Sequence, residues 1–153
     1  MINLIVLDEP ADWPLNIPGA EIVSARDYLT EDRYSGIRNA RVYNLCESYR
    51  YQTTGYYVSL LAAARGHRPL PDVMTIQDIK TWTMLRPADE LEDLIGSSLG
   101  QIQSDKFELS VYFGRNLAKR HSRLSRALFN LFPVPLLRAS FQRRRDQWRL
   151  VGL

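Results

Sequence analysis

The stretch from Arg41 to Gly66 constrains the fold more than any other part of this 153-residue chain. It begins with RVYNLC, an apolar run of strand length, continues through a polar loop at residues 47–53, and enters an apolar helix predicted over residues 54–65. Gly66 is placed to end that helix. A strand, a loop and a helix that is apolar on more than one face are typical of α/β layers with parallel strands. The stretch therefore predicts an α/β fold.

The other elements extend this prediction to a parallel N-terminal core with antiparallel C-terminal strands. Ile2–Leu7 is a continuous apolar run that stops at Asp-Glu-Pro, as a buried strand does. Residues 106–113 alternate between apolar and polar side chains and predict a strand with one wet face. We expect a single, three-layer-like domain over residues 1–153 with one mixed sheet. Further strands are expected at 20–25, 41–46, 136–142 and 147–151, and further helices at 75–82, 87–96 and 117–132.

Single residues in the sequence predict where several helices begin or end. Thr75 and Asp78 have the spacing of a capping box. Pro87 suits a first helical position, and Gly96 suits the end of the same helix. Residues 143–146 are expected to form a hairpin turn, while 69–71 are expected to form a connector because two prolines bound them. The apolar stripe of the helix at 117–132 is expected to comprise Leu117, Leu124, Leu128 and Leu131.

The compartment follows from cysteine use and from the apolar runs. Cys46 is the only cysteine, so an internal disulfide is impossible and a reducing compartment is the simplest one. The N-terminus lacks the positive region of a signal peptide. The longest uncharged apolar stretch elsewhere, residues 58–64, is far short of the roughly 20 residues that a membrane span needs. We expect a cytoplasmic protein without membrane attachment.

The usual catalytic patterns do not occur in the sequence. It contains no GxxxxGK[ST], GxGxxG or GxSxG motif. His67 and His121 are far apart and no Cys/His cluster exists, so we expect no metal site and place both histidines on the surface at helix ends. At a strand end, Cys46 is expected to be a buried structural thiol rather than a nucleophile.

The loop at residues 47–55 is the first candidate for a contact site. It follows the carboxyl end of a predicted internal strand and precedes a helix N-terminus, where α/β proteins bind ligands and anions. Arg50 offers a planar fork for a carboxylate or phosphate. The alternative is a packed loop that only caps the helix. The candidate ligand- or partner-binding residues are Arg50, Tyr51, Gln52, Thr53 and Gly55, together with Arg115, which follows a strand end.

A steep charge gradient is the second feature. Up to Glu108 there are 10 basic and 16 acidic residues, whereas from Leu109 onward there are 10 basic and 1 acidic. This end could form a positive surface for phosphate contacts, but it lacks aromatic-basic interleaving and any known reader motif, so we do not expect nucleic acid as its partner. A surface that docks an acidic neighbour is the other interpretation. The basic-surface candidates are Lys119, Arg123, Arg126, Arg143, Arg144 and Arg145.

Two stretches of the sequence resemble a known family. VYNLCESYRYQTTGYYVSLLAAARGHRPLP (42–71) and KFELSVYFGRNLAKRHSRLSRALFNLFPVPLLRASF (106–141) resemble the domain found N-terminal to RimK-like ATP-grasp ligases. In that family the domain usually precedes an ATP-grasp module that forms amide or peptide bonds through an acyl-phosphate. The resemblance implies that ATP and Mg belong to such an adjoining module, so no cofactor is expected in this chain, and it supplies no catalytic residues.

The resemblance leads to a function that we expect. An ATP-grasp module would need roughly another 200 residues on domain-size grounds, so none is expected within this chain. We expect a non-catalytic accessory or substrate-positioning domain of an ATP-dependent carboxylate–amine ligase, with the ATP-grasp domain and an acidic substrate or peptide as partners. The alternative is a module that binds nucleic acid or another anionic polymer through its arginine-rich end. The edge of the last strand could also pair with a second copy.

Overall fold

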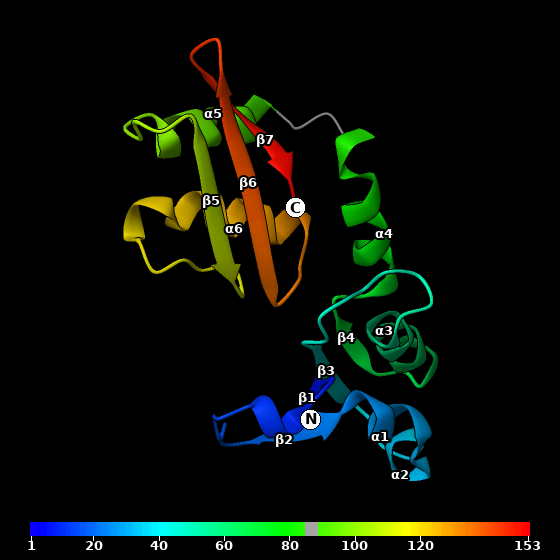
Figure 1. Ribbon diagram of the computed structural model, residues 1–153. Helices are drawn as coiled ribbons and strands as arrows, with labels where there is room; N and C mark the ends of the chain where they lie inside the picture. Colours follow the sequence, from blue (N-terminus) through cyan, green and yellow to red (C-terminus); the bar gives the residue numbers. More distant parts are fainter. Residues whose placement is uncertain (85–88) are drawn as a thin grey trace. The chain divides into compact units, whose positions relative to one another are not determined.

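The strands pair into two separate sheets in the computed structural model, which describes residues 1–84 and 89–153 (Figure 1). A parallel sheet of order β2-β1-β3-β4 lies in one compact unit, Met1–Gln77, and an antiparallel sheet of order β5-β6-β7 lies in a second, Asp78–Leu153. The α/β class, the parallel N-terminal strands and the antiparallel C-terminal strands are therefore confirmed. One refinement is needed, because the two sets of strands form two sheets instead of sharing one.

The first unit is a parallel sheet with its helices on one side. Its strands are β1 (Ile2–Leu7), β2 (Ala20–Ser24), β3 (Ala40–Asn44) and β4 (Arg68–Leu70). Figure 1 shows α1 (Ala25–Thr30), α2 (Asp32–Ser35) and α3 (Thr54–Ala64) on the same side of this sheet. Leu4 and Val6 of β1 pack with Val42 of β3 and with α3 in one buried core. A short helical turn, η1 (Pro10–Asp12), lies between β1 and β2.

The region after α3 differs from the sequence prediction. Gly66 has a φ of +74° and ends the helix as expected. The expected connector contains a short strand, β4, which tolerates Pro69 because β4 pairs only with β3 and forms the edge of the sheet. The next helix, α4 (Val73–Thr81), begins earlier than the predicted capping box, because Asp72 accepts a hydrogen bond from the Thr75 N–H at 2.7 Å.

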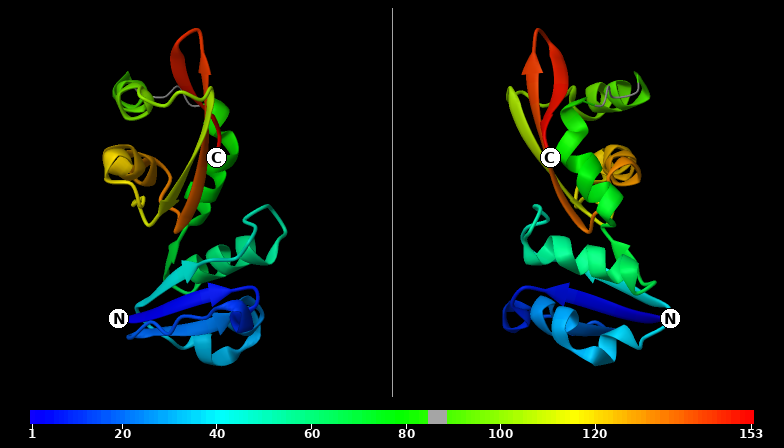
Figure 2. Two further views of the ribbon diagram at one scale, coloured as in Figure 1. Left: turned by 60° about the vertical axis from the view of Figure 1, so that its left-hand side comes forward. Right: turned by 90° about the vertical axis from the view of Figure 1, so that its right-hand side faces the viewer.

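The second unit is an antiparallel sheet covered by helices on one face. Its strands are β5 (Lys106–Tyr112), β6 (Leu136–Arg144) and β7 (Gln147–Gly152). Figure 2 shows α5 (Asp89–Leu99) and α6 (Ser122–Leu131) on the same side of this sheet. The alternating strand residues Leu109, Val111 and Phe141 are buried in the core with both helices. The short helices η2 (Trp82–Met84) and η3 (Lys119–His121) complete the unit.

Some predicted boundaries in the second unit are wrong. Gly96 does not end its helix, since α5 continues to Leu99, which is fully buried. The predicted start at Pro87 lies outside the described residues. Leu117 precedes α6 and is 95% exposed, so the apolar stripe begins at Leu124 instead. The hairpin turn is narrower than expected, because β6 extends to Arg144, whereas β7 begins at Gln147 as predicted.

Within residues 1–84 and 89–153, no helix combines the length and apolarity needed to cross a membrane.

Candidate functional site

The first candidate site lies at the carboxyl edge of the parallel sheet, where the strand order reverses. The chain leaves β1 toward β2 on one side and leaves β3 toward β4 on the other. Ligands of open α/β sheets bind at such a reversal. A pocket of about 170 Å³ is present there, and the Glu47 N–H donates to the Asp8 carboxylate across it at 2.8 Å. The pocket is lined by Leu7, Asp8, Glu9, Asp12, Trp13, Leu45 and Glu47.

A buried amide holds the loop at residues 47–55 against this edge. Asn44, the last residue of β3, is fully buried, and its side-chain N–H groups donate to the Gly55 carbonyl at 2.7 Å and the Ser59 hydroxyl at 2.9 Å. Its side-chain oxygen accepts the Cys46 N–H at 3.2 Å. The Ser59 hydroxyl donates onward to the Pro71 carbonyl at 2.7 Å. The end of β3, the start of α3 and the segment after β4 are thereby joined.

Two further hydroxyl groups fix the shape of the loop. The Tyr49 hydroxyl donates to the Asn44 carbonyl at 2.5 Å, and burial raises the pKa of this phenol above its ordinary value. The Thr53 hydroxyl contacts the carbonyls of Ser48, at 3.0 Å, and Arg50, at 2.6 Å. Thr53 stands at the N-cap of α3 but makes no side-chain cap bond. Its hydroxyl therefore stabilises the loop rather than the helix end.

The predicted contact residues divide into an exposed tip and a packed base. Arg50, Tyr51 and Gln52 are exposed, with Tyr51 at 64%, and Gln52 has a φ of +68°. Gly55 is buried, and a Cβ there would lie 2.2 Å from the Ser48 carbonyl oxygen. Gly55 thus permits close packing of α3 on the loop. The side chains presented to solvent are those of Arg50, Tyr51 and Gln52.

Arg115 lies in the other compact unit. It follows β5 in a tight two-residue turn, where the Tyr112 N–H donates to the Arg115 carbonyl at 2.7 Å and the Arg115 N–H donates back at 2.9 Å. Its side chain is exposed. The strand-end position predicted for Arg115 is correct, and its role in contacts remains a prediction.

Cys46 is a buried thiol beside a carboxylate. It is 5% exposed, and burial, together with the neighbouring Asp8 carboxylate, raises its pKa to about 12. A thiol with so high a pKa is almost wholly protonated near neutral pH and is therefore a poor nucleophile.

The two histidines are buried, so their predicted surface positions are wrong. The His67 Nδ1 lies 2.8 Å from the Tyr28 hydroxyl, and its Nε2 lies 3.0 Å from the Ile37 carbonyl. A carbonyl only accepts, so Nε2 carries the proton and Nδ1 accepts from Tyr28. His121 is 2% exposed, and burial followed by the Arg120 charge lowers its pKa. In the described part of the chain, no group of three or more His, Cys, Asp or Glu side chains could hold a metal ion.

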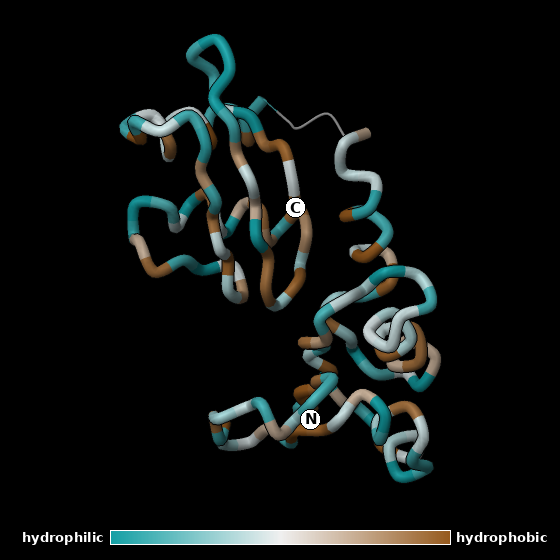
Figure 3. Tube along the Cα trace, in the orientation of Figure 1, coloured by the Kyte–Doolittle hydropathy of each residue, from teal (hydrophilic) through white to brown (hydrophobic). Residues whose placement is uncertain are grey.

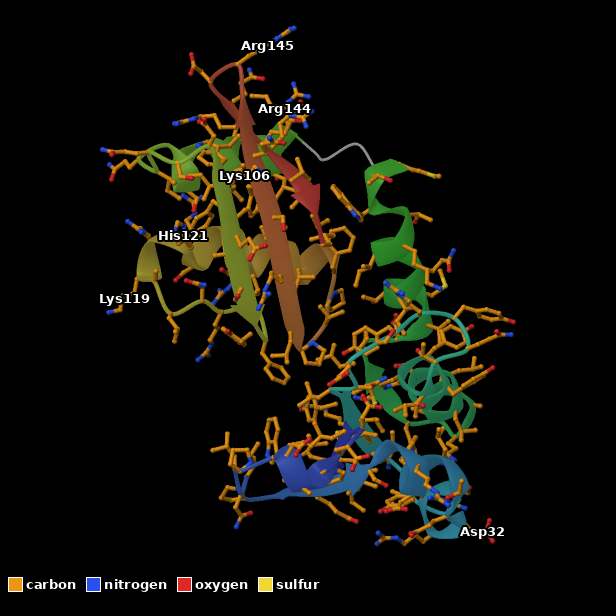
Figure 4. All side chains as sticks on the ribbon, viewed as in Figure 1. Asp32, Lys106, Lys119, His121, Arg144 and Arg145 are labelled. Carbon is orange, nitrogen blue, oxygen red and sulfur yellow. The ribbon has the colours of Figure 1, made fainter. Side chains whose placement is uncertain are left out.

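The basic-surface candidates form two groups in the second unit. Lys119, Arg123 and Arg126 are exposed at η3 and along α6. Arg144 and Arg145 project from the tip of the β6–β7 hairpin, away from Lys119 (Figure 4). The hairpin tip is hydrophilic along its length (Figure 3). Arg143 belongs to neither group, because its guanidinium binds Asp105 at 2.9 Å and the Gln103 carbonyl at 2.9 Å.

The sequence analysis did not predict the structural roles of Asn44 and Asp8, although the sequence position of each residue indicates such a role. Asn44 is the one uncharged polar side chain within the apolar run RVYNLC, and Asp8 directly follows the first buried strand. Polar side chains at the carboxyl ends of two strands that proved adjacent, β1 and β3, mark the edge where the loop is attached.

The comparisons with known proteins give one match. A family model described as RimK-like ATPgrasp N-terminal domain matches residues 25–153, which include parts of both compact units. No curated protein and no solved structure matches the chain significantly.

Proposed function

Because the chain belongs to the family of RimK-like ATP-grasp N-terminal domains, we propose that it is a non-catalytic accessory domain that positions a substrate for an ATP-grasp amide or peptide ligase. ATP and Mg bind the ATP-grasp module in this proposal, and the present chain contributes contacts to the acidic substrate or to that module. The observation that carries the proposal is the exposed tip Arg50–Tyr51–Gln52, which stands on an internally bonded base.

The chemistry of the tip suits a carboxylate or phosphate group. The Arg50 guanidinium can donate two parallel hydrogen bonds to such a group, and the Gln52 amide and Tyr51 hydroxyl can add neutral donors. The base that carries them is held by Tyr49, Thr53 and the buried Asn44. Such a base reduces the ordering cost when a ligand or a neighbouring domain binds.

The position of the loop at the sheet edge also supports this role. The loop leaves the carboxyl end of β3 next to β1, and Asp8 of the β1 end binds the Glu47 N–H. A substrate held at the loop tip would lie at the edge of the sheet where α/β domains bind their ligands.

The experiment measures ATP turnover by an ATP-grasp module joined to this chain, with its carboxylate and amine substrates, for the original sequence and for Arg50→Ala. Loss of a charge-assisted contact of about 1.5–3 kcal/mol predicts a roughly 10- to 150-fold fall in kcat/KM. Arg26→Ala changes another exposed arginine of the same unit and should leave turnover unchanged. Unchanged turnover in a folded Arg50→Ala variant would contradict the proposed role of the loop.

The alternative, binding of nucleic acid or another anionic polymer, has one observation in its favour. Lys106, Gln142 and Arg149 form a row across the three strands, on the sheet face opposite the helices. Arg138 and Arg144 are exposed along β6 on the same face. Binding through these side chains would weaken steeply with salt, and Arg144→Glu with Arg145→Glu would reduce it further. Absence of binding to DNA or RNA at low ionic strength removes this alternative.

A further inference from the structure

A pocket in the second unit is separate from the loop at residues 47–55. It has a volume of about 460 Å³, which is within the range of small-molecule sites. Its lining residues come from α5 and the glycine that follows it on one side, and from the β6–β7 hairpin on the other. The pocket is lined by Glu92, Asp93, Gly96, Gly100, Arg143, Asp146, Gln147, Trp148 and Arg149.

Arg143 belongs to the framework of this pocket. Its Nε donates to the Asp105 carboxylate at 3.0 Å, and its terminal nitrogens bind the carbonyls of Ile102 at 3.2 Å and Gln103 at 2.9 Å. The guanidinium also lies 5.4 Å from the centre of the Trp148 ring. Arg143 thus fastens the segment after α5 to the hairpin, and its charge is already neutralised by Asp105.

The remaining charged groups of the lining lack such partners. Within the described residues, no ion pair engages Glu92, Asp93 or Asp146, and each of these side chains is exposed. Arg149 lies on the edge strand β7, where it borders both this pocket and the opposite sheet face. Among the described residues its side chain makes only a long hydrogen bond, 3.4 Å, to the Gln147 side chain. The lining therefore offers three carboxylates and one available guanidinium to a ligand.

Trp148 adds an indole N–H to the same pocket. The residue lines the cavity, and its indole N–H makes no hydrogen bond to any described residue. This N–H can donate to an acceptor on a ligand in the pocket.

Gly96 keeps the α5 wall open. A Cβ at this position would have no atom within 4 Å, so a side chain would extend into free space. Gly96 and Gly100 lie one helical turn apart and both line the pocket. A glycine inside a helix is less stabilising than alanine, so the free space beside Gly96 is kept although it weakens the helix.

We propose that this pocket binds a free amino acid with a basic side chain. The α-carboxylate would meet Arg149 and the Trp148 N–H, while the two cationic groups of the ligand would meet Glu92, Asp93 and Asp146. An acidic amino acid would bring more negative charge to a wall that is already acidic, so the pocket selects against it. The proposal does not rest on the accessory role proposed above, since the site lies in the other unit and binding requires no ATP turnover.

The test is calorimetric titration of the full chain with L-lysine and L-arginine, with amide NMR shifts at Gly96 and Gly100 to locate the site. Two analogues separate the contacts. Norleucine lacks the side-chain ammonium of lysine and tests the acidic wall, whereas cadaverine lacks the carboxylate and tests Arg149. Each analogue should bind at least about tenfold more weakly than L-lysine, as expected for one lost charge-assisted contact. L-Glutamate should not bind.

Gly96→Leu is the decisive variant because it fills the pocket without straining the helix. It should abolish lysine binding and leave thermal stability unchanged or higher. Ser97→Leu adds the same side chain at the next position of α5, outside the lining, and should bind lysine like the original chain. The proposal is overturned if neither basic amino acid binds, if glutamate binds as well as lysine, or if folded Gly96→Leu binds lysine unchanged.

Discussion

Replacing Asn44 with alanine tests how the edge of the parallel sheet is held together. Asn44 is fully buried and makes three hydrogen bonds, to the Gly55 carbonyl, the Ser59 hydroxyl and the Cys46 N–H. In Asn44→Ala the Ser59 hydroxyl keeps its bond to Pro71, and the Gly55 carbonyl stays within α3, where it accepts from the helix backbone. The Cys46 N–H loses its partner. The variant also leaves a small cavity where the amide was.

The magnitude follows from one buried N–H left without a partner and from two further hydrogen bonds that are lost. The unpaired Cys46 N–H costs about 1–3 kcal/mol, and the lost bonds to Gly55 and Ser59 cost about 0.5–1.5 kcal/mol each, which together give about 2–6 kcal/mol. This is a large part of the roughly 5–15 kcal/mol by which a typical domain is stable. We therefore expect Asn44→Ala to lower the free energy of unfolding of the first unit by about 4 kcal/mol and to speed amide exchange in the loop at residues 47–55.

Urea unfolding followed by circular dichroism measures the loss, and hydrogen exchange shows where it occurs. Asn3→Ala is the matched control, since Asn3 lies on the neighbouring strand and makes one exposed bond, 3.3 Å, to the Gly19 carbonyl. It should cost less than about 1 kcal/mol. An Asn44→Ala loss as small as that of the control, or unchanged exchange in the loop, would refute the reasoning.

Three other predictions concern single groups. Ser125 has a fully buried hydroxyl that finds no hydrogen-bond partner among residues 1–84 and 89–153, so Ser125→Ala should raise the free energy of unfolding by about 1 kcal/mol. A loss of stability in urea would contradict this. Gly114 has a φ of +77°, and a Cβ at this position would lie 3.1 Å from the Phe129 ring. Gly114→Ala should therefore lower the thermal midpoint of unfolding by an amount equivalent to about 1–3 kcal/mol. An unchanged midpoint would count against this prediction. Burial raises the pKa of Cys46 to about 12 from an ordinary value of 9.0, so the folded chain should hold roughly 1000-fold less thiolate near neutral pH than an unperturbed cysteine. The thiol should therefore react with a disulfide reagent in urea but scarcely without it. Equal reaction rates in the two conditions would be inconsistent with a buried thiol.

The local pattern of the sequence predicted the elements well where one residue type decides the outcome. The strand at Ile2–Leu7, the start of α3 at Thr54 and its end before Gly66 follow from apolar runs and from glycine. The existence of β4 did not follow, because Pro69 in the middle of this strand is compatible with a strand only when that strand forms a sheet edge. Edge position is a property of the whole sheet.

The errors at the histidines have the same origin. His67 is buried because Tyr28, 39 residues earlier, supplies a hydrogen bond to its Nδ1. His121 is buried because Ser98, 23 residues earlier, lies 2.7 Å from its Nδ1. No window of local sequence contains both members of either pair. A histidine near a helix end is therefore indistinguishable from a surface residue until the chain has folded.

The candidate loop shows which part of a site the sequence can predict. Its position after a strand and before a helix was correct, and Arg50, Tyr51 and Gln52 are exposed. The sequence did not predict that Thr53 and Gly55 hold the base of the loop instead of contacting a ligand, because these roles depend on the distance of both residues from the backbone of Ser48. That distance arises only when α3 packs on the loop.

The difference in net charge between the two parts of the chain is smaller when the chain is divided at the boundary between the two compact units. Residues 1–77 contain 7 basic and 9 acidic residues, and residues 78–153 contain 13 basic and 8 acidic, so the net charges are −2 and +5. The gradient is milder than in the sequence because the acidic helix α5 belongs to the basic unit. There Glu92 and Asp93 line the pocket, whereas Lys106, Arg138 and Arg144 lie on the sheet face opposite the helices. The two surfaces of this unit therefore suit different ligands. Binding of an anionic polymer to the sheet face should be insensitive to Gly96→Leu, and lysine binding in the pocket should be insensitive to Arg144→Glu.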